Sequence, residues 1–169
     1  MDFTHLYVET SYSMNGSNIT IQDLIEKANE FGFSALAMTD IRMHGVIQFY
    51  QSCIKNKIKP IIGLQAVLEG VNPEFTSKIL VYAMNQIGYQ NLLKISSVMA
   101  HKGILTEKEM KAYNDGILVI YLSTNSELYH YFVNSQKTEF VQVIQSLNSQ
   151  CKEYLISVSS HTEFNKFFD

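Results

Sequence analysis

The 169-residue sequence has no surplus of basic residues, since 13 Lys and Arg stand against 16 Asp and Glu and the formal net charge is −3. A domain that grips nucleic acid unaided neutralises phosphates with Lys and Arg, so this balance argues against that class of protein. Cysteines are scarce as well. Cys53 and Cys151 form no CxxC pair and have no His at metal-binding spacing, which favours reduced thiols in a cytosolic protein.

Signals for membrane insertion and export are also missing. No apolar run approaches the roughly 20 residues that a membrane-spanning helix needs. Residues 1–5 lack the basic start and the apolar block of a signal peptide. We therefore expect a cytoplasmic protein without a membrane partner.

The composition is that of a globular protein, with 46% hydrophobic and 17% charged residues. The length suits a single domain over residues 1–169 with a sizeable core.

Apolar runs alternate with stretches of helical spacing along the chain. We expect strands over 3–8, 34–39, 58–68, 78–84, 117–122 and 154–159, and helices over 21–31, 45–57, 87–101, 126–134, 139–148 and 163–168, with a short helix after Thr106. This order predicts an α/β fold with a largely parallel sheet, open or closed into a barrel.

The segment from His5 to Gln65 contains the first three predicted strands, and each of them ends in polar residues. Glu9 follows the first strand, Asp40 the second, and Gln65 lies within the third. Parallel strands bring their carboxyl ends to one edge of a sheet, which is where α/β proteins build their sites. The sequence therefore predicts that any functional site lies at this edge.

Several motifs in this order resemble one family. They are His5-Leu6-Tyr7-Val8-Glu9-Thr10-Ser11, Ala35-Leu36-Ala37-Met38-Thr39-Asp40, Lys59-Pro60-Ile61-Ile62-Gly63, Gly88-Tyr89-Gln90-Asn91-Leu92 and Gly116-Ile117-Leu118-Val119. The chain resembles the polymerase and histidinol phosphatase (PHP) domain, in the form found at the N-terminus of bacterial DNA polymerase III alpha subunits. The resemblance implies a distorted (β/α)7 TIM-like barrel, C-terminally incomplete here because the family domain continues past its sixth strand. Active members of the family hold divalent metals at the strand edge and hydrolyse phosphoesters.

The chain departs from the family at the metal ligands. The family's His-x-His motif reads Tyr7 and Glu9 here, its Thr-Asp-His motif ends in Ile41, and its third-strand Glu is Gln65. Only Asp40 is kept. Tyr is not a usual ligand, Ile has no donor atom, and Gln is neutral, so the resemblance implies a degenerate site with no metal, no cofactor and no catalytic residue in this chain.

Weaker candidates remain open. Glu9, Asp40 and His44 could hold a single ion or act as acid and base, although solvated polar groups are the more common outcome at a strand edge. His5 could orient a site residue through a hydrogen bond, but a lone His at the start of a strand more often bonds to the nearby backbone. We expect Asp40 to cap a helix or to accept backbone donors near the second helix.

Three functions follow from these observations. In the first, the chain is the non-catalytic N-terminal module of a replicative DNA polymerase III alpha subunit. Its partners would then be the remaining polymerase domains, DNA bound by the full-length protein and other replisome subunits, with Mg²⁺ needed only by the full-length polymerase. In the second, it is a metal-dependent PHP phosphoesterase with a remodelled site on Glu9, Asp40 and His44. In the third, which the negative charge disfavours, it binds nucleic acid by itself.

Overall fold

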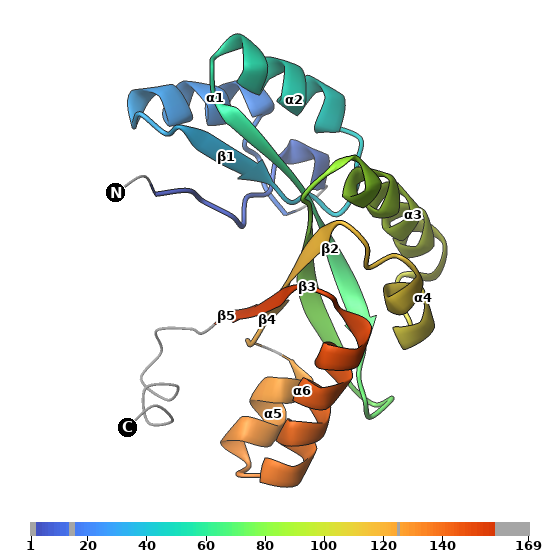
Figure 1. The fold of residues 1–169 in the computed structure, drawn as a ribbon. Coiled ribbons are helices and arrows are strands. Elements are labelled where there is room, and N and C mark those ends of the chain that lie inside the picture. The colour runs from blue at the N-terminus through green and yellow to red at the C-terminus, as the bar shows by residue number, and fades with distance from the viewer. Residues whose placement is uncertain (1–2, 14–15, 125, 158–169) are drawn as a thin grey trace.

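A computed structural model describes residues 3–13, 16–124 and 126–157, in which helices pack against a mixed β-sheet (Figure 1). The elements are a 3-10 helix η1 (Ser11–Ser13), α1 (Ile21–Glu30), β1 (Ala35–Met38), α2 (Val46–Lys55), β2 (Lys59–Glu69), β3 (Thr76–Ala83), α3 (Gln86–Lys102), α4 (Glu107–Ala112), β4 (Ile117–Leu122), α5 (Glu127–Val133), α6 (Lys137–Gln150) and β5 (Tyr154–Ser157). The α/β class is thereby confirmed. Within the described residues, no helix has the length and apolar character needed to span a membrane.

The expected strand over residues 3–8 is not one of the strands of the described sheet. The chain there is extended and lies beside the end of β1, where the Thr39 amide donates to the Val8 carbonyl at 2.8 Å. The Val8 amide turns to the Thr39 hydroxyl at 3.0 Å, and the Leu6 carbonyl accepts the Tyr82 hydroxyl at 2.7 Å. The Val8 amide and the Leu6 carbonyl are thus bonded to side chains and not to a neighbouring strand. The segment therefore pairs with the β1 end through a single backbone hydrogen bond. The expected helix over 163–168 lies outside the described residues.

The prediction of a largely parallel sheet was wrong. The strand order is β1-β2-β3-β4-β5, with parallel pairs only at the two ends, β1 with β2 and β4 with β5. The pairs β2–β3 and β3–β4 are antiparallel. The reason for the first reversal is the short connection after β2, because a parallel return needs a dozen or more residues. Instead, Gly70 donates to the Phe75 carbonyl at 3.0 Å and closes a tight hairpin turn.

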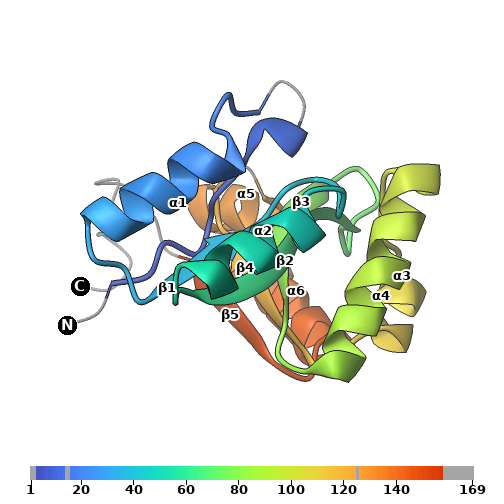
Figure 2. The same ribbon diagram turned by 90° about the horizontal axis from the view of Figure 1, so that it is seen from above.

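Helices cover one face of the sheet in two groups (Figures 1 and 2). α1 and α2 pack over β1 through a core that includes Ile25, Leu36, Phe49 and Cys53. The remaining helices enclose a larger core over β2, β3 and β4. The opposite face carries a smaller cluster of Ala37, Leu80, Tyr82 and Ile120.

Two helices begin with capping boxes. At α1, the Asp23 amide donates to the Thr20 hydroxyl at 3.1 Å and the Thr20 amide donates to the Asp23 carboxylate at 3.3 Å. Thr106 and Glu109 repeat this arrangement at α4. The Lys102 ammonium, together with the Thr106 donors, lowers the pKa of Glu109 to about 2. Reciprocal satisfaction of the first backbone donors fixes where both helices start.

A buried carboxylate holds the β2–β3 turn in place. Glu127, the first residue of α5, accepts the amides of Val71 and Asn72 at 2.8 Å each and the Tyr131 hydroxyl at 3.2 Å. A Cβ atom at Gly70 would lie 2.8 Å from the same carboxylate, so glycine makes room for it. Because the turn amides have no strand partner, this carboxylate ties α5 to the hairpin.

We predict that Glu127→Gln destabilises the fold by about 2 kcal/mol, because the new amide group would face a backbone donor in a buried position. Urea unfolding followed by circular dichroism measures the change. Glu107→Gln is the matched control, since Glu107 is also the first residue of a helix but pairs with Lys111 at the surface. It should cost about 0.5 kcal/mol or less. Equal losses for the two variants would contradict the role of Glu127.

Candidate functional site: the polar edge of β1 and β2

Three of the predicted site residues meet just beyond the end of β1, beside the middle of β2. The Tyr7 hydroxyl lies 3.2 Å from Glu9 Oε1 and 3.3 Å from Gln65 Oε1, so it can donate to either oxygen. The Gln65 amide group donates to the Glu9 carboxylate and to the Thr39 carbonyl, the latter at 3.0 Å. Lys78 from β3 donates to the Tyr7 hydroxyl at 3.5 Å. The result is a hydrogen-bonded network with one carboxylate and one ammonium group.

The backbone of β2 sets the position of this network. The backbone N–H of Gln65 donates to the backbone carbonyl of Asp40 at 3.1 Å, which extends the β1–β2 pairing beyond the end of β1. Two residues earlier, a Cβ at Gly63 would lie within 3 Å of the Tyr82 ring and the Thr39 methyl group. Glycine at this position lets the Tyr82 ring lie against the strand. Burial raises the pKa of Tyr82, and the neighbouring Tyr7 raises it further, so Tyr82 stays a hydroxyl donor.

Asp40 is fully buried and accepts hydrogen bonds from the N-terminal turn. Its Oδ1 accepts the Thr10 amide at 2.6 Å and the Ser13 hydroxyl at 2.7 Å, and its Oδ2 accepts the Thr10 hydroxyl at 2.6 Å. We expected donors near the second helix, and that expectation was wrong about their location. The N-cap residue of α2 is Gly45, which has no side chain to cap the helix, whereas the turn after residue 9 lies directly against the end of β1.

The other candidates do not join this cluster. Ile41 is partly exposed beside the network, and His44 is exposed in the turn before α2. His5 packs against the rings of Phe3 and Phe33, with ring centroids 4.6 and 5.4 Å apart. These contacts give His5 a packing role at the start of the chain.

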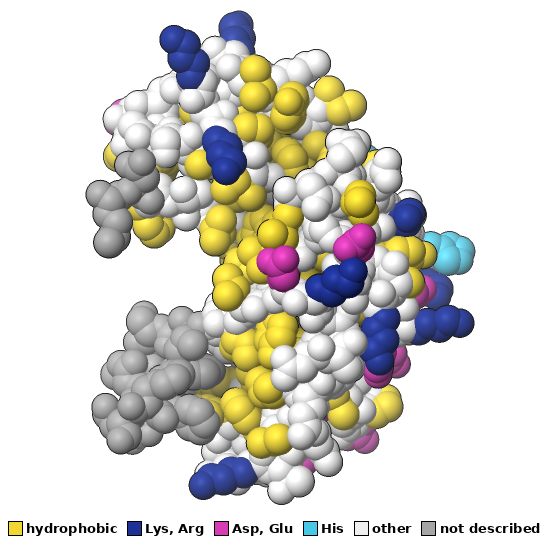
Figure 3. Space-filling view, in the orientation of Figure 1, with side chains coloured by type: hydrophobic (Ala, Val, Ile, Leu, Met, Phe, Trp, Pro, Cys, Tyr) yellow, Lys and Arg dark blue, Asp and Glu magenta, His cyan; other side chains and the backbone are white. Residues whose placement is uncertain are grey.

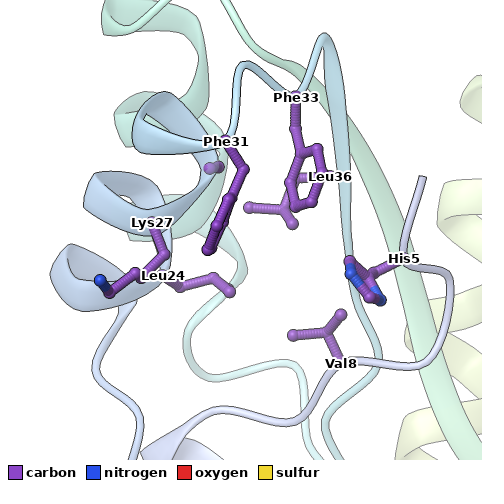
Figure 4. Close-up of a pocket in the computed structure, with 8 residues that line it drawn as sticks. His5, Val8, Leu24, Lys27, Phe31, Phe33 and Leu36 are labelled. Carbon is purple, nitrogen blue, oxygen red and sulfur yellow. The ribbon is translucent and has the colours of Figure 1, made fainter. Parts of the chain in front are cut away.

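Two cavities flank the network. The larger one, about 370 Å³, lies between α1 and the N-terminal segment, where Leu24, Phe31, Phe33 and Val8 make its wall mostly apolar (Figure 4). The smaller one, about 250 Å³, is lined in part by Ile41, Arg42, Gln65 and Lys78. The lining of the smaller cavity brings the cationic side chains of Arg42 and Lys78 close to Gln65.

The donor set does not fit a cluster of divalent metals. Among the residues that the structure describes, no group of three or more His, Cys, Asp and Glu side chains is placed to hold an ion. Both oxygens of Asp40 already accept protein donors. Ile41 offers no donor atom, and Gln65 supplies no charge to offset the desolvation of an ion. The arrangement is suited to holding strand ends together through hydrogen bonds.

Sequence reasoning missed the residues that complete these networks. Thr10 and Ser13 donate the hydrogen bonds to the Asp40 carboxylate. From β3, Lys78 reaches the Tyr7 hydroxyl and Tyr82 reaches the Leu6 carbonyl. The available signal was the run of hydroxyl residues from Thr10 to Ser13, which is typical of turns with side-chain hydrogen bonds. The sequence contained no local sign of the contacts from β3.

Comparisons with known proteins agree on one family. The model of the PHP domain family matches residues 5–161. The DNA polymerase III subunit alpha of Bacillus subtilis (strain 168) is 42% identical over 124 residues, which cover 71% of this chain and 11% of the relative. The corresponding subunit of Staphylococcus epidermidis (strain ATCC 12228) is 31% identical over 162 residues, or 94% of this chain and 14% of the relative. The chain thus spans about 11–14% of the length of these curated relatives.

A solved structure supports the fold. An amidohydrolase from Chromobacterium violaceum, with bound sulfate and no metal, superimposes with a TM-score of 0.60 over 97% of this chain and 81% of the other chain. The two sequences are 9% identical, so the likeness concerns the fold alone.

We predict that Asp40→Asn destabilises the protein by about 3 kcal/mol, since the new amide group would face the Thr10 or Ser13 donors in a buried site. Glu9→Gln is the control from the neighbouring network, because it keeps an acceptor oxygen for Tyr7 and Gln65. It should cost less than about 1 kcal/mol. Thermal and urea unfolding of both variants measure the difference. A mild effect of Asp40→Asn, no larger than that of Glu9→Gln, would rule out the anchoring role of Asp40.

Proposed function

This chain belongs to the PHP domain family, and from that premise we propose that it is the N-terminal domain of a bacterial replicative DNA polymerase, acting there as a non-catalytic module. The observation that carries the proposal is the agreement of its relatives, which are named DNA polymerase III subunit alpha and match over this region. A domain of this kind supports the polymerase by its shape and contacts.

The chemistry of the strand edge supports the non-catalytic part of the proposal. Phosphoester hydrolysis in a metal site needs several ligands that converge on ions, which activate water and bind the phosphate. Here Tyr7, Ile41 and Gln65 stand where the family resemblance places ligands, and Asp40 is engaged by Thr10 and Ser13. The chain itself would then need no cofactor.

The activity of the whole protein would reside outside this chain. In this proposal, the full-length polypeptide adds deoxynucleotides to a primer in the cytoplasm and uses Mg²⁺ at a site that the present residues do not form. Its other domains, DNA and further replisome subunits would be its partners. The formal charge of −3 supports the view that DNA is held by the full-length protein and not by this domain alone.

The alternative is a phosphoesterase with a remodelled site on Glu9, Asp40 and His44. Two observations weigh against it. His44 is exposed in the turn before α2, and Asp40 is buried with its oxygens already bonded. An active site of this kind would have to break the Asp40 bonds before the carboxylate could act as base or ligand.

We predict that the chain binds Mn²⁺ more weakly than about 1 mM, because the site lacks ligand charge. The triple variant Tyr7→His, Ile41→His and Gln65→Glu should bind Mn²⁺ at least tenfold more tightly, since it restores two imidazoles and a carboxylate around Glu9. Isothermal titration calorimetry measures both affinities, and circular dichroism checks that the variant is folded. Stoichiometric Mn²⁺ binding by the unaltered chain at micromolar concentrations would refute the loss of the metal site.

We predict that Glu9→Gln in the full-length polypeptide leaves the rate of primer extension within about twofold of the parent, because Glu9 is remote from nucleotide transfer in this proposal. A primer-extension assay with purified protein measures the rate, and Glu107→Gln serves as a surface control. If the parent polypeptide does not extend primers, the polymerase assignment fails. If only Glu9→Gln slows extension, the non-catalytic assignment fails.

A further inference from the structure

The outward face of α2 carries a stripe of large apolar side chains. Ile47, Tyr50 and Ile54 are 69%, 50% and 54% exposed. Their spacing of three and then four residues places them on one side of the helix. The other side of α2, with Val46, Phe49 and Cys53, is buried in the core. α2 is therefore apolar on two sides, which is typical of helices that are buried all round.

The neighbouring helix α1 does not carry exposed apolar side chains of this kind on its outward face. α1 packs beside α2 on the same core, yet its outward positions are polar or charged, and Lys27 pairs there with Glu30. By contrast, α2 has no charged residue before its last position, Lys55. Figure 3 shows hydrophobic side chains gathered over α2 at the top of the molecule. Contiguous exposed apolar side chains of this kind mark sites of protein contact.

The C-terminal end of α2 adds charge to this surface. Lys55, Lys57 and Lys59 are exposed there, and none of them takes part in the ion pairs found among the described residues. A partner that fits this surface has an apolar centre that receives Tyr50 and an acidic rim beside the lysines. An aromatic residue at the centre with charges at the edge is the usual anatomy of a contact surface.

The length of the relatives indicates what covers the stripe. In the Bacillus subtilis subunit, the matched region is 11% of the polypeptide, and in the Staphylococcus epidermidis subunit it is 14%. We propose that Ile47, Tyr50 and Ile54 form the surface on which another domain of the same, longer polypeptide packs. This inference rests on the proposed function, and it assigns to α2 the contact between domains.

Site-specific thiol labelling tests the proposal. The two native cysteines are buried, and burial raises the pKa of both thiols to about 11, so they label slowly near neutral pH. Gln51→Cys places a single accessible thiol inside the stripe, and Gln145→Cys places a matched thiol on the exposed side of α6. Each variant is made in the 169-residue chain and in the full-length polypeptide, and labelling by a maleimide is followed over time.

We expect Gln51→Cys to label at least tenfold more slowly in the longer polypeptide than in the isolated chain, which corresponds to about 1.4 kcal/mol of protection. Gln145→Cys should label at the same rate in both. Equal rates for Gln51→Cys would overturn the proposal. Protection in the isolated chain that grows with concentration would overturn it in favour of a second copy, and a natural polypeptide no longer than this chain would overturn it as well.

A primer-extension assay on the same full-length samples separates the two proposals. Protection of Gln51→Cys without primer extension would refute the polymerase assignment and leave the domain contact standing. Primer extension without protection would refute the contact and leave the assignment standing.

Discussion

The buried carboxylate of Asp40 is the interaction on which the arrangement of the strand edge depends. Three donors from one short turn, the Thr10 amide, the Thr10 hydroxyl and the Ser13 hydroxyl, meet this group at 2.6–2.7 Å. A charged group without such donors would be too costly to bury. The same contacts hold the N-terminal segment against the end of β1, which places Tyr7 and Glu9 beside Gln65. The position of the whole edge therefore follows from how one carboxylate is satisfied.

The neighbouring network satisfies its polar groups with partners from the protein itself. Tyr7 and Gln65 join Glu9 through hydrogen bonds between side chains, and Lys78 adds an ammonium group to that network. A network with a single carboxylate, whose donors and acceptors satisfy one another, needs no bound cation to offset repulsion between ligands. This favours a structural use of the edge, in which strand ends are fixed and the domain presents other surfaces, such as α2, to its surroundings.

The elements with strong local signals could be predicted from the sequence. The capping boxes at Thr20 and Thr106 fixed the starts of two helices, and the apolar run after Gly116 identified β4. The extended segment before Val8 has the composition of a strand, yet tertiary contacts from Thr39 and Tyr82 occupy the backbone groups that it needs for pairing. The direction of β3 depended on a short turn whose closure by Glu127, far along the chain, has no local signal.

The sequence predicted which residues belong to the candidate site, but not which hydrogen bonds they make. Motif positions identified Tyr7, Glu9, Asp40 and Gln65, and the structure brings three of them into one network. The donors to Asp40 could not be deduced, because which turn faces a buried carboxylate is decided by packing. The most direct test is a crystal structure grown with Mn²⁺ and measured for anomalous scattering. The account predicts no peak near Glu9 and an Asp40 carboxylate still bonded to Thr10 and Ser13, whereas a manganese peak bridging Glu9 and Asp40 would contradict it.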